Sequence, residues 1–270
     1  DFRVGFHPFN LMPPAGPPAG MESYIWTLEE CSRLGARAVS LFPHMIPKEL
    51  TTDTLSEMAG MARERDVELL LYPFTVWGLA GLPLRVGAWG ATGAMMGVSA
   101  PGDAPDSSVA AKGVEKTITM AKALNSRILC GGYGHNNVAT SRYNKEFPFS
   151  EQKKFIVANL KVMADMLEGT GLVFAYENHC DFNGREIASV IEEVGSKNVM
   201  ALYDFGNGAV ACCDPMEDAE YLAPYAVAAH FKDFAVVDNP LRTKLYPDMP
   251  LVTTGCYLGD GYMDFERILK

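Results

Sequence analysis

The chain has 270 residues, 48% of them hydrophobic, and a formal net charge of −10 at pH 7. This length suits one (β/α)8 barrel, which typically needs about 250 residues. The negative charge disfavours binding to the phosphate backbone of a nucleic acid, which needs a positive surface. No apolar stretch reaches the roughly 18 residues that a membrane span needs, so none is predicted.

The six cysteines include no Cys-x-x-Cys pair, and no basic-then-apolar leader is visible at the start of the chain. Three of the cysteines, Cys130, Cys180 and Cys256, fall in predicted strands or at strand ends. We therefore expect a reduced, cytoplasmic protein.

Eight short apolar runs indicate buried parallel strands. In chain order they are RVGF from Arg3, AVSLF from Ala38, VELLLY from Val67, RILCGG from Arg127, LVFAYE from Leu172, VMALYD from Val199, VAAHF from Val227 and LVTTGCY from Leu251. Helical patterns lie between them, near residues 21–34, 52–65, 108–124, 150–170, 185–194 and 214–222. Eight alternations of strand and helix favour an α/β protein with a single (β/α)8 TIM barrel over residues 1–270. A doubly wound open sheet is the alternative.

Three long connections follow predicted strands, over residues 8–20, 78–105 and 236–250. The second is rich in Gly, Ala, Pro and Met, and a long loop of this kind predicts a lid over the site. The third carries Arg242 and Lys244, which could meet an anionic group. A solvated connector is the alternative for each loop. A last helix begins at Asp264, and we expect it to continue beyond Lys270.

Four chemically active side chains come at or just after the ends of predicted strands: Glu177, Asp204, His230 and Asp260. They are 27, 26 and 30 residues apart, which is one strand plus one helix each time. Because barrel active sites lie at this end of the strands, we expect the three carboxylates and the imidazole to ring one divalent cation. An oxygen-rich set with one imidazole favours Mn2+, with Mg2+, Co2+ or Zn2+ as alternatives.

Each member of this quartet also has a structural alternative. Glu177 could pair with Lys232, because a carboxylate at the end of a buried strand is costly alone. Asp204 could cap the next helix. His230 could be a hydrogen-bonded core histidine, and Asp260 could be an ordinary turn residue beside glycines.

All five histidines follow or lie in predicted strands, which favours a polar, catalytic face at that end of the barrel. They are His7, His44, His135, His179 and His230.

The chain resembles the xylose isomerase-like TIM-barrel superfamily, the sugar phosphate isomerase/epimerase group, over essentially its whole length. The motifs that carry the resemblance are YENHCDFNGREI around Glu177, LYDFGN around Asp204, HFKD at His230 and LGDGYMDF at Asp260. It implies that Glu177, Asp204 and His230 bind a divalent metal and that Asp260 completes the set. Two positions depart from the family pattern: the last ligand is usually Glu, and several members carry His in place of Asn207. The second departure argues against the apurinic endonuclease branch.

The resemblance implies an enzyme of carbohydrate metabolism acting on an α-hydroxy-carbonyl sugar or sugar acid. The reaction would be isomerisation or epimerisation through a metal-stabilised enediolate. Glu177 is the candidate base, and the second acid–base group is His179, His135 or Asp260. Lys232 could polarise the substrate carbonyl.

The predicted substrate contacts are His7, Trp77, Asn178 and Arg242. One alternative function is a lyase that uses the same metal enolate as a decarboxylase, a dehydratase or a C-glycoside-cleaving enzyme. A further alternative is a sugar-binding barrel without turnover. The expected partner is a small-molecule carbohydrate, with no nucleic acid and no membrane, in a homo-oligomer such as family members often form.

Overall fold

The computed structural model describes residues 3–6, 20–42, 45–73, 76–83, 104–134, 141–240, 248 and 250–269. The chain divides into two compact units. The first consists of Asp1–Gly131, Ala158–Phe174 and Lys197–Val199, and the second of Gly132–Val157, Ala175–Ser196 and Met200–Lys270. The expected single domain stays a prediction.

Seven strands form one sheet whose spatial order follows the chain, from β1 to β7. Their bounds are β1 Gly5–Phe6, β2 Ala38–Leu41, β3 Glu68–Leu71, β4 Ile128–Gly132, β5 Val173–Glu177, β6 Val199–Asp204 and β7 Ala226–His230. The pairs β1–β2, β2–β3, β3–β4 and β6–β7 are parallel. A doubly wound sheet reverses its strand order at a switch point. The sequential order therefore agrees with the predicted barrel and argues against that alternative.

The predicted helices are all present, with ends that shift by at most three residues. They are α1 Met21–Arg33, α2 Thr52–Glu64, α4 Ser107–Ala123, α5 Phe149–Leu167, α6 Gly184–Val194, α8 Pro215–Leu222 and α9 Phe265–Ile268. Shorter pieces are α7 Asn207–Val210 and the 3-10 turns η3 Val76–Gly78 and η5 Ala223–Tyr225.

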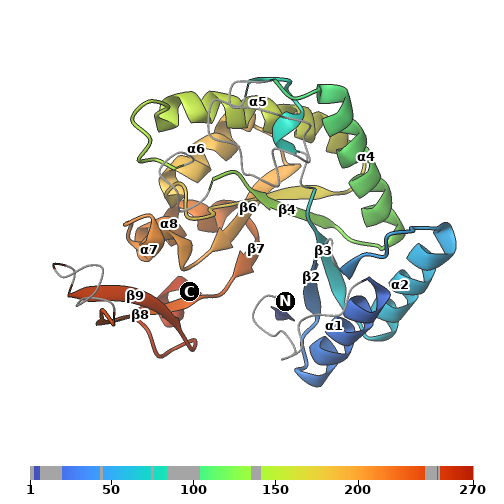
Figure 1. Cartoon of the computed structure of the whole chain (residues 1–270), viewed down its shortest axis with the longest axis horizontal. Coiled ribbons are helices and arrows are strands. Elements are labelled where there is room, and N and C mark those ends of the chain that lie inside the picture. Colours follow the sequence, from blue (N-terminus) through green and yellow to red (C-terminus); the bar gives the residue numbers. More distant parts are fainter. Residues whose placement is uncertain are drawn as a thin grey trace. The chain divides into compact units, whose positions relative to one another are not determined.

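In the first unit, α1 packs on β2 and α2 packs on β3, and the two helices contact each other (Figure 1). Tyr24 of α1 is fully buried, and its hydroxyl donates to the Met58 carbonyl of α2 at 2.7 Å. Leu28, Leu69 and Leu71 fill the apolar space between helices and strands. This burial of alternate strand faces and helix stripes is what the apolar runs predict.

In the second unit, β5 and β6 are buried along almost their whole length, as parallel strands covered on both faces should be. Helix α6 begins with a capping box, in which the Asn183 side chain accepts from the Glu186 N–H and the Glu186 carboxylate accepts from the Asn183 N–H. The helix ends at Gly195, whose φ of 67° is the left-handed value that glycine tolerates.

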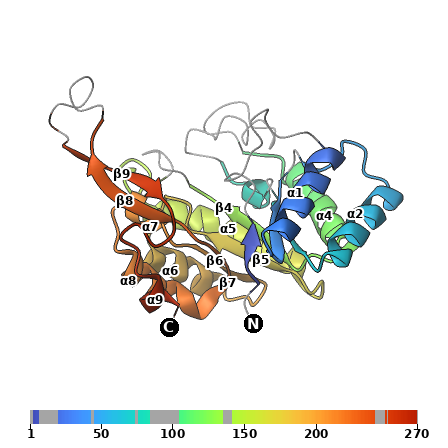
Figure 2. The same cartoon turned by 90° about the horizontal axis from the view of Figure 1, so that it is seen from below.

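The eighth predicted strand differs from expectation. The run from Leu251 forms β9, Leu251–Cys256, which pairs antiparallel with β8, Asp233–Asp238, in a separate two-stranded sheet (Figure 2). Its centre holds Thr253, Thr254 and Gly255, so it lacks the continuous apolar side chains of a strand buried on both faces. The residues just before the predicted connection over 236–250, together with the first three residues of that connection, thus form a strand that the sequence analysis missed.

Strand β7 is also more exposed than predicted, although its last residue, His230, is half-buried. The six cysteines all lie among the described residues, and none of them forms a disulfide. Among the described helices, none has the length and apolar character needed to cross a membrane.

Candidate metal centre

Three neighbouring strands of the second unit each end on a side chain that can ligate a metal. Glu177 is the last residue of β5, Asp204 of β6 and His230 of β7. The parallel register of β6 and β7 sets Asp204 directly beside His230. The predicted position of these residues at the carboxyl ends of the strands is therefore confirmed, whereas their role as metal ligands stays a prediction.

The three side chains converge. His230 Nδ1 lies 3.3 Å from Glu177 Oε1 and 3.4 Å from Asp204 Oδ2. One ligand atom from each residue lies within 4.8 Å of the others. Spacing of this kind suits a common cation, since metal–oxygen and metal–nitrogen bonds are about 2.0–2.2 Å long.

Burying these charged side chains costs free energy unless opposite charges lie beside them. Asp204 has 0% of its surface exposed and Glu177 has 6%. Neither Asp204 oxygen accepts a hydrogen bond of good geometry from the described residues, although cationic side chains lie close to Oδ2. Two buried carboxylates beside a single imidazole therefore form a donor set that fits a divalent cation.

The pKa values show how strongly the three groups interact. Burial acts to lower the pKa of His230, but the adjacent carboxylates of Asp204 and Glu177 outweigh it and raise that pKa to about 9. Burial acts to raise the pKa of Glu177, but His230 outweighs it and brings that pKa to about 2. The electrostatic environment of Glu177 and His230 thus favours a positive charge between the two acidic side chains.

Lys232 lies next to the cluster. Its Nζ is 2.5 Å from Asp204 Oδ2 and 3.1 Å from Asn207 Oδ1. Asn207 Oδ1 also accepts from the Cys180 thiol at 2.9 Å. Because an ammonium group can only donate, the oxygen of the Asn207 amide must face Lys232. The Asn207 Nδ2 group is buried and has no acceptor among the described residues.

Asn178 has a structural part in this arrangement. Its Oδ1 accepts from the Asp204 N–H at 2.7 Å and its Nδ2 donates to the Asp204 carbonyl at 3.0 Å. The side chain is fully buried, and both ends of its amide are used to hold the end of β6. None of these contacts supports the substrate contact predicted from the sequence.

Asp260 lies outside the cluster. It is exposed, in the turn after β9, and its N–H donates to the Tyr257 carbonyl at 3.0 Å. Since β9 joins a hairpin instead of the main sheet, its following turn does not continue the row of strand ends that Glu177, Asp204 and His230 form. Its assignment as a fourth ligand stays a prediction.

The sequence analysis missed the part played by Asp233 in the HFKD motif. This buried carboxylate accepts backbone N–H groups from Gly259 and Gly261 at 2.9 Å, from Met263 at 3.2 Å and from Phe234 at 2.8 Å. It thereby anchors the glycine-rich turn that carries Asp260. The signal that could have predicted these contacts is the acidic residue of the HFKD motif together with a glycine-rich turn, whose backbone N–H groups need acceptors.

The remaining predicted site residues are placed as follows. His179 Nδ1 lies 3.0 Å from the Gly134 carbonyl in the second unit. Trp77 belongs to η3 in the first unit and is buried. His7, His135 and Arg242 lie outside the described residues, so their predicted roles stay predictions.

Residues 28–270 match the family described as xylose isomerase-like TIM barrel. The chain belongs to this family. The predicted α/β barrel class is thereby confirmed. In a barrel of this family the carboxyl ends of the strands form the catalytic face. The buried Glu177–Asp204–His230 cluster occupies those ends, so it is the candidate active site of this xylose isomerase-like protein.

One curated relative is the uncharacterized protein YihM of Escherichia coli strain K12, which is 28% identical over 115 residues. That match covers 42% of this chain and 33% of YihM, so the alignment spans only about a third of the relative.

Three solved structures show the same fold at low identity. A xylose isomerase-like TIM barrel protein from Mycobacterium smegmatis in complex with magnesium has a TM-score of 0.65 at 12% identity, covering 99% of this chain and 85% of that one. The probable 3-DHS dehydratase AsbF from Bacillus anthracis gives 0.62 at 12% identity, with coverages of 99% and 88%. An L-ribulose 3-epimerase gives 0.61 at 18% identity, with coverages of 99% and 76%.

Proposed function

We propose that this protein is a divalent-metal-dependent enzyme that moves a proton on a carbon beside the carbonyl of a sugar or sugar acid, as an isomerase or epimerase. The observation that carries the proposal is the buried convergence of Glu177, Asp204 and His230 at three adjacent strand ends. Family membership and the epimerase among the similar folds support the same reading.

Glu177, Asp204 and His230 would hold the cation, and Asp260, the fourth ligand that the sequence motif predicts, would contribute little because it is exposed and lies apart from these three. The cation would supply Lewis-acid stabilisation of negative charge on a substrate oxygen. The oxygen-rich donor set favours Mn2+ over a structural Zn2+ site, with Mg2+ and Co2+ as alternatives. The magnesium in the M. smegmatis protein supports a cation that prefers oxygen ligands.

The chain's own groups would move the proton and hold the substrate. Glu177 or His179 takes the proton from carbon, and the second of the two, or His135, returns it. Lys232 places a positive charge beside Asp204, where it can steady a negatively charged substrate oxygen. The Nδ2 group of Asn207, for which the described part of the chain supplies no acceptor, can donate to a substrate hydroxyl, carbonyl or carboxylate.

A lyase is the second candidate. A proton abstracted from the same carbon can be followed by loss of water or an aglycone, whereas a decarboxylase would form the same enolate by losing carbon dioxide in place of the proton. The observation that favours it is the position of Asp260, which is exposed and lies apart from the cluster. Glu177 and Asp260 are therefore not assembled as an acid–base pair. The dehydratase among the similar folds supports the same alternative.

The proposed substrate is a small carbohydrate, as the epimerase relative suggests. Six free thiols support a reducing compartment such as the cytoplasm. Assembly as a homo-oligomer stays a prediction.

The test uses a panel of keto-sugars and sugar acids in deuterated water with Mn2+. An isomerase or epimerase is expected to incorporate solvent deuterium into recovered substrate and product, and EDTA should abolish this. A lyase would release water, carbon dioxide or an aglycone instead. If no panel member exchanges or reacts, and if EDTA changes nothing, the proposal fails.

A further inference from the structure

His179 is held by a hydrogen bond that defines its tautomer. Its Nδ1 lies 3.0 Å from the carbonyl oxygen of Gly134. A carbonyl can only accept, so Nδ1 must carry the proton in this bond. In the neutral imidazole, Nε2 then carries the lone pair and is the basic nitrogen.

Gly134 is in turn held by Asp181. The Gly134 N–H donates to Asp181 Oδ2 at 2.7 Å, so both backbone groups of Gly134 are engaged. Gly132, two residues before Gly134, also lies very close to His179. A Cβ on Gly132 would lie 2.6 Å from the His179 Cβ, which is closer than real contacts allow. Only glycine at position 132 lets the end of β4 approach His179 in this way.

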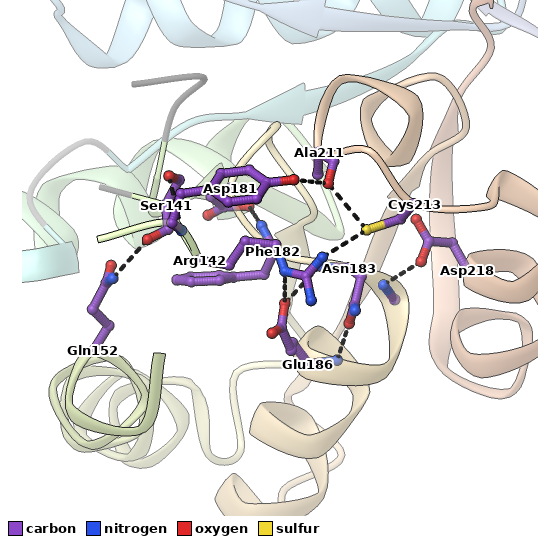
Figure 3. A network of polar contacts seen from close by, with 12 residues as sticks. Ser141, Arg142, Gln152, Asp181, Phe182, Asn183, Glu186, Ala211, Cys213 and Asp218 are labelled. Atoms are coloured by element: carbon purple, nitrogen blue, oxygen red, sulfur yellow. Dashed lines mark hydrogen bonds and ion pairs between the residues drawn. The ribbon is translucent and has the colours of Figure 1, made fainter. Parts of the chain in front are cut away.

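Asp181 is itself anchored to the start of α6 (Figure 3). It is fully buried, its Oδ1 accepts from the Phe182 N–H at 2.8 Å, and its carbonyl accepts from the Arg142 N–H at 3.0 Å. The Arg142 guanidinium lies 3.3 Å from Glu186, which closes the capping box of α6. The carboxylate that holds Gly134 therefore belongs to a network of polar contacts that reaches the start of α6 through Arg142 and Glu186.

We propose that Asp181 is a positioning residue that acts through Gly134 to fix His179 in one orientation and in the Nδ1–H tautomer. A buried carboxylate is costly unless it is hydrogen-bonded, and the oxygens of Asp181 accept the N–H groups of Gly134 and Phe182. Its use here gives Nε2 of His179 a defined lone pair for proton transfer. The role of Nε2 in proton transfer rests on the proposed function, whereas the assignment of the tautomer does not.

The direct test is nuclear magnetic resonance of protein with 15N-labelled histidine, loaded with diamagnetic Mg2+. At about pH 8.5 an ordinary imidazole is neutral, and long-range proton–nitrogen correlations then distinguish the two tautomers. The His179 signals are assigned by their loss in His179→Gln. Wild-type protein is expected to show the Nδ1–H pattern for His179. An Nε2–H pattern, or an even mixture of the two, overturns the inference without any variant.

The variants then separate positioning from mere loop stability. Asp181→Ala should give a mixture of His179 tautomers and lower kcat about 30-fold, which is less than the roughly 100- to 10,000-fold effect of a general acid or base itself, with KM and Mn2+ affinity changed less than about threefold. Asp181→Asn keeps one oxygen, which can accept from the Gly134 N–H but then leaves the Phe182 N–H without its acceptor, so the tautomer and kcat should return in part.

Asp218→Ala is the matched control, because Asp218 is another buried carboxylate in the second unit that accepts one backbone N–H, from Gly184 at 2.6 Å. It should leave the His179 tautomer unchanged. An Asp181→Ala protein that keeps both the wild-type tautomer and kcat contradicts the inference. Absence of turnover in a wild-type protein that shows the Nδ1–H tautomer would count against the proposed function alone.

Discussion

Two regions of the second unit begin from the same sequence pattern and end in different structures. The β5, β6 and β7 strands end on Glu177, Asp204 and His230, which converge. The run of β9 is likewise followed by an acidic residue, Asp260, yet it forms an antiparallel hairpin in which Leu251 is 53% exposed. An acidic residue after an apolar run thus becomes part of a buried cluster only where the strand joins the parallel sheet.

The difference lies in the side chains that each strand carries on its two faces. The β5 sequence VFAYE and the β6 sequence VMALYD carry apolar side chains on both faces, and burying these side chains stabilises a parallel sheet. The β9 sequence LVTTGC carries two threonines and a glycine, which suit a half-exposed antiparallel pair. Substitutions in each region can test this contrast.

The largest expected effect is on catalysis at the buried cluster. Glu177→Gln keeps the size of the side chain but removes its charge, so it weakens a ligand and removes a candidate base. We expect kcat/KM to fall by about a thousandfold or more. Steady-state kinetics with the substrate found in the deuterium screen checks this. Full activity together with full metal content would remove Glu177 from both roles.

The next effect concerns the turn after β9. Asp233→Ala leaves four backbone N–H groups without their acceptor, and we expect the free energy of unfolding to fall by about 2–4 kcal/mol. Burial acts to raise the pKa of Asp233, but these N–H groups outweigh it and lower that pKa. Its stabilising effect should therefore be present above the ordinary carboxyl range and be lost as pH falls through the folded pKa.

Urea unfolding at several pH values measures this loss. Asp238→Ala is the control, because Asp238 is an exposed carboxylate at the other end of the same strand. Equal destabilisation by the two substitutions would contradict the anchoring role of Asp233.

Asp218 extends the comparison to a buried carboxylate outside the cluster. Burial raises its pKa from 3.8 to about 6, so the folded protein holds this proton more tightly than the unfolded chain. The cost of ionising it grows as pH rises from about 4 to about 6 and is fully present above that window.

Asp218→Asn removes this cost. Its stability relative to wild type should therefore improve across the same window, by at most about 3 kcal/mol. Urea titrations of both proteins at pH 4.5 and pH 7.5 check it, and a difference that does not depend on pH would refute the prediction.

The smallest expected effect is at Asp260. Because it is exposed and outside the cluster, Asp260→Ala should weaken Mn2+ binding by less than about tenfold, or about 1.4 kcal/mol. Calorimetric titration decides this. A loss as large as that of an Asp204 substitution would make Asp260 a full ligand, as the sequence motif predicts.

Local patterns were enough to predict the helices and the strand ends that carry Glu177, Asp204 and His230, because apolar periodicity and the strand–helix interval are local properties. They did not predict the partner of β9, since strand pairing depends on residues far apart in the chain. They also did not indicate that the Asn178 amide holds the Asp204 backbone, because that contact joins residues 26 apart in the chain. The anchoring of backbone donors by Asp181 and Asp233 depends on tertiary contacts that no motif spacing encodes.

The central claim is that Glu177, Asp204 and His230 hold one divalent cation, and calorimetric titration of metal-free protein with Mn2+ tests it most directly. Wild-type protein should bind about one Mn2+ per chain, and Asp204→Ala should bind it at least about a hundredfold more weakly, because a fully buried ligand is lost. The account would be contradicted by a wild-type protein that binds no Mn2+, Mg2+, Co2+ or Zn2+, or by an Asp204→Ala protein with unchanged affinity.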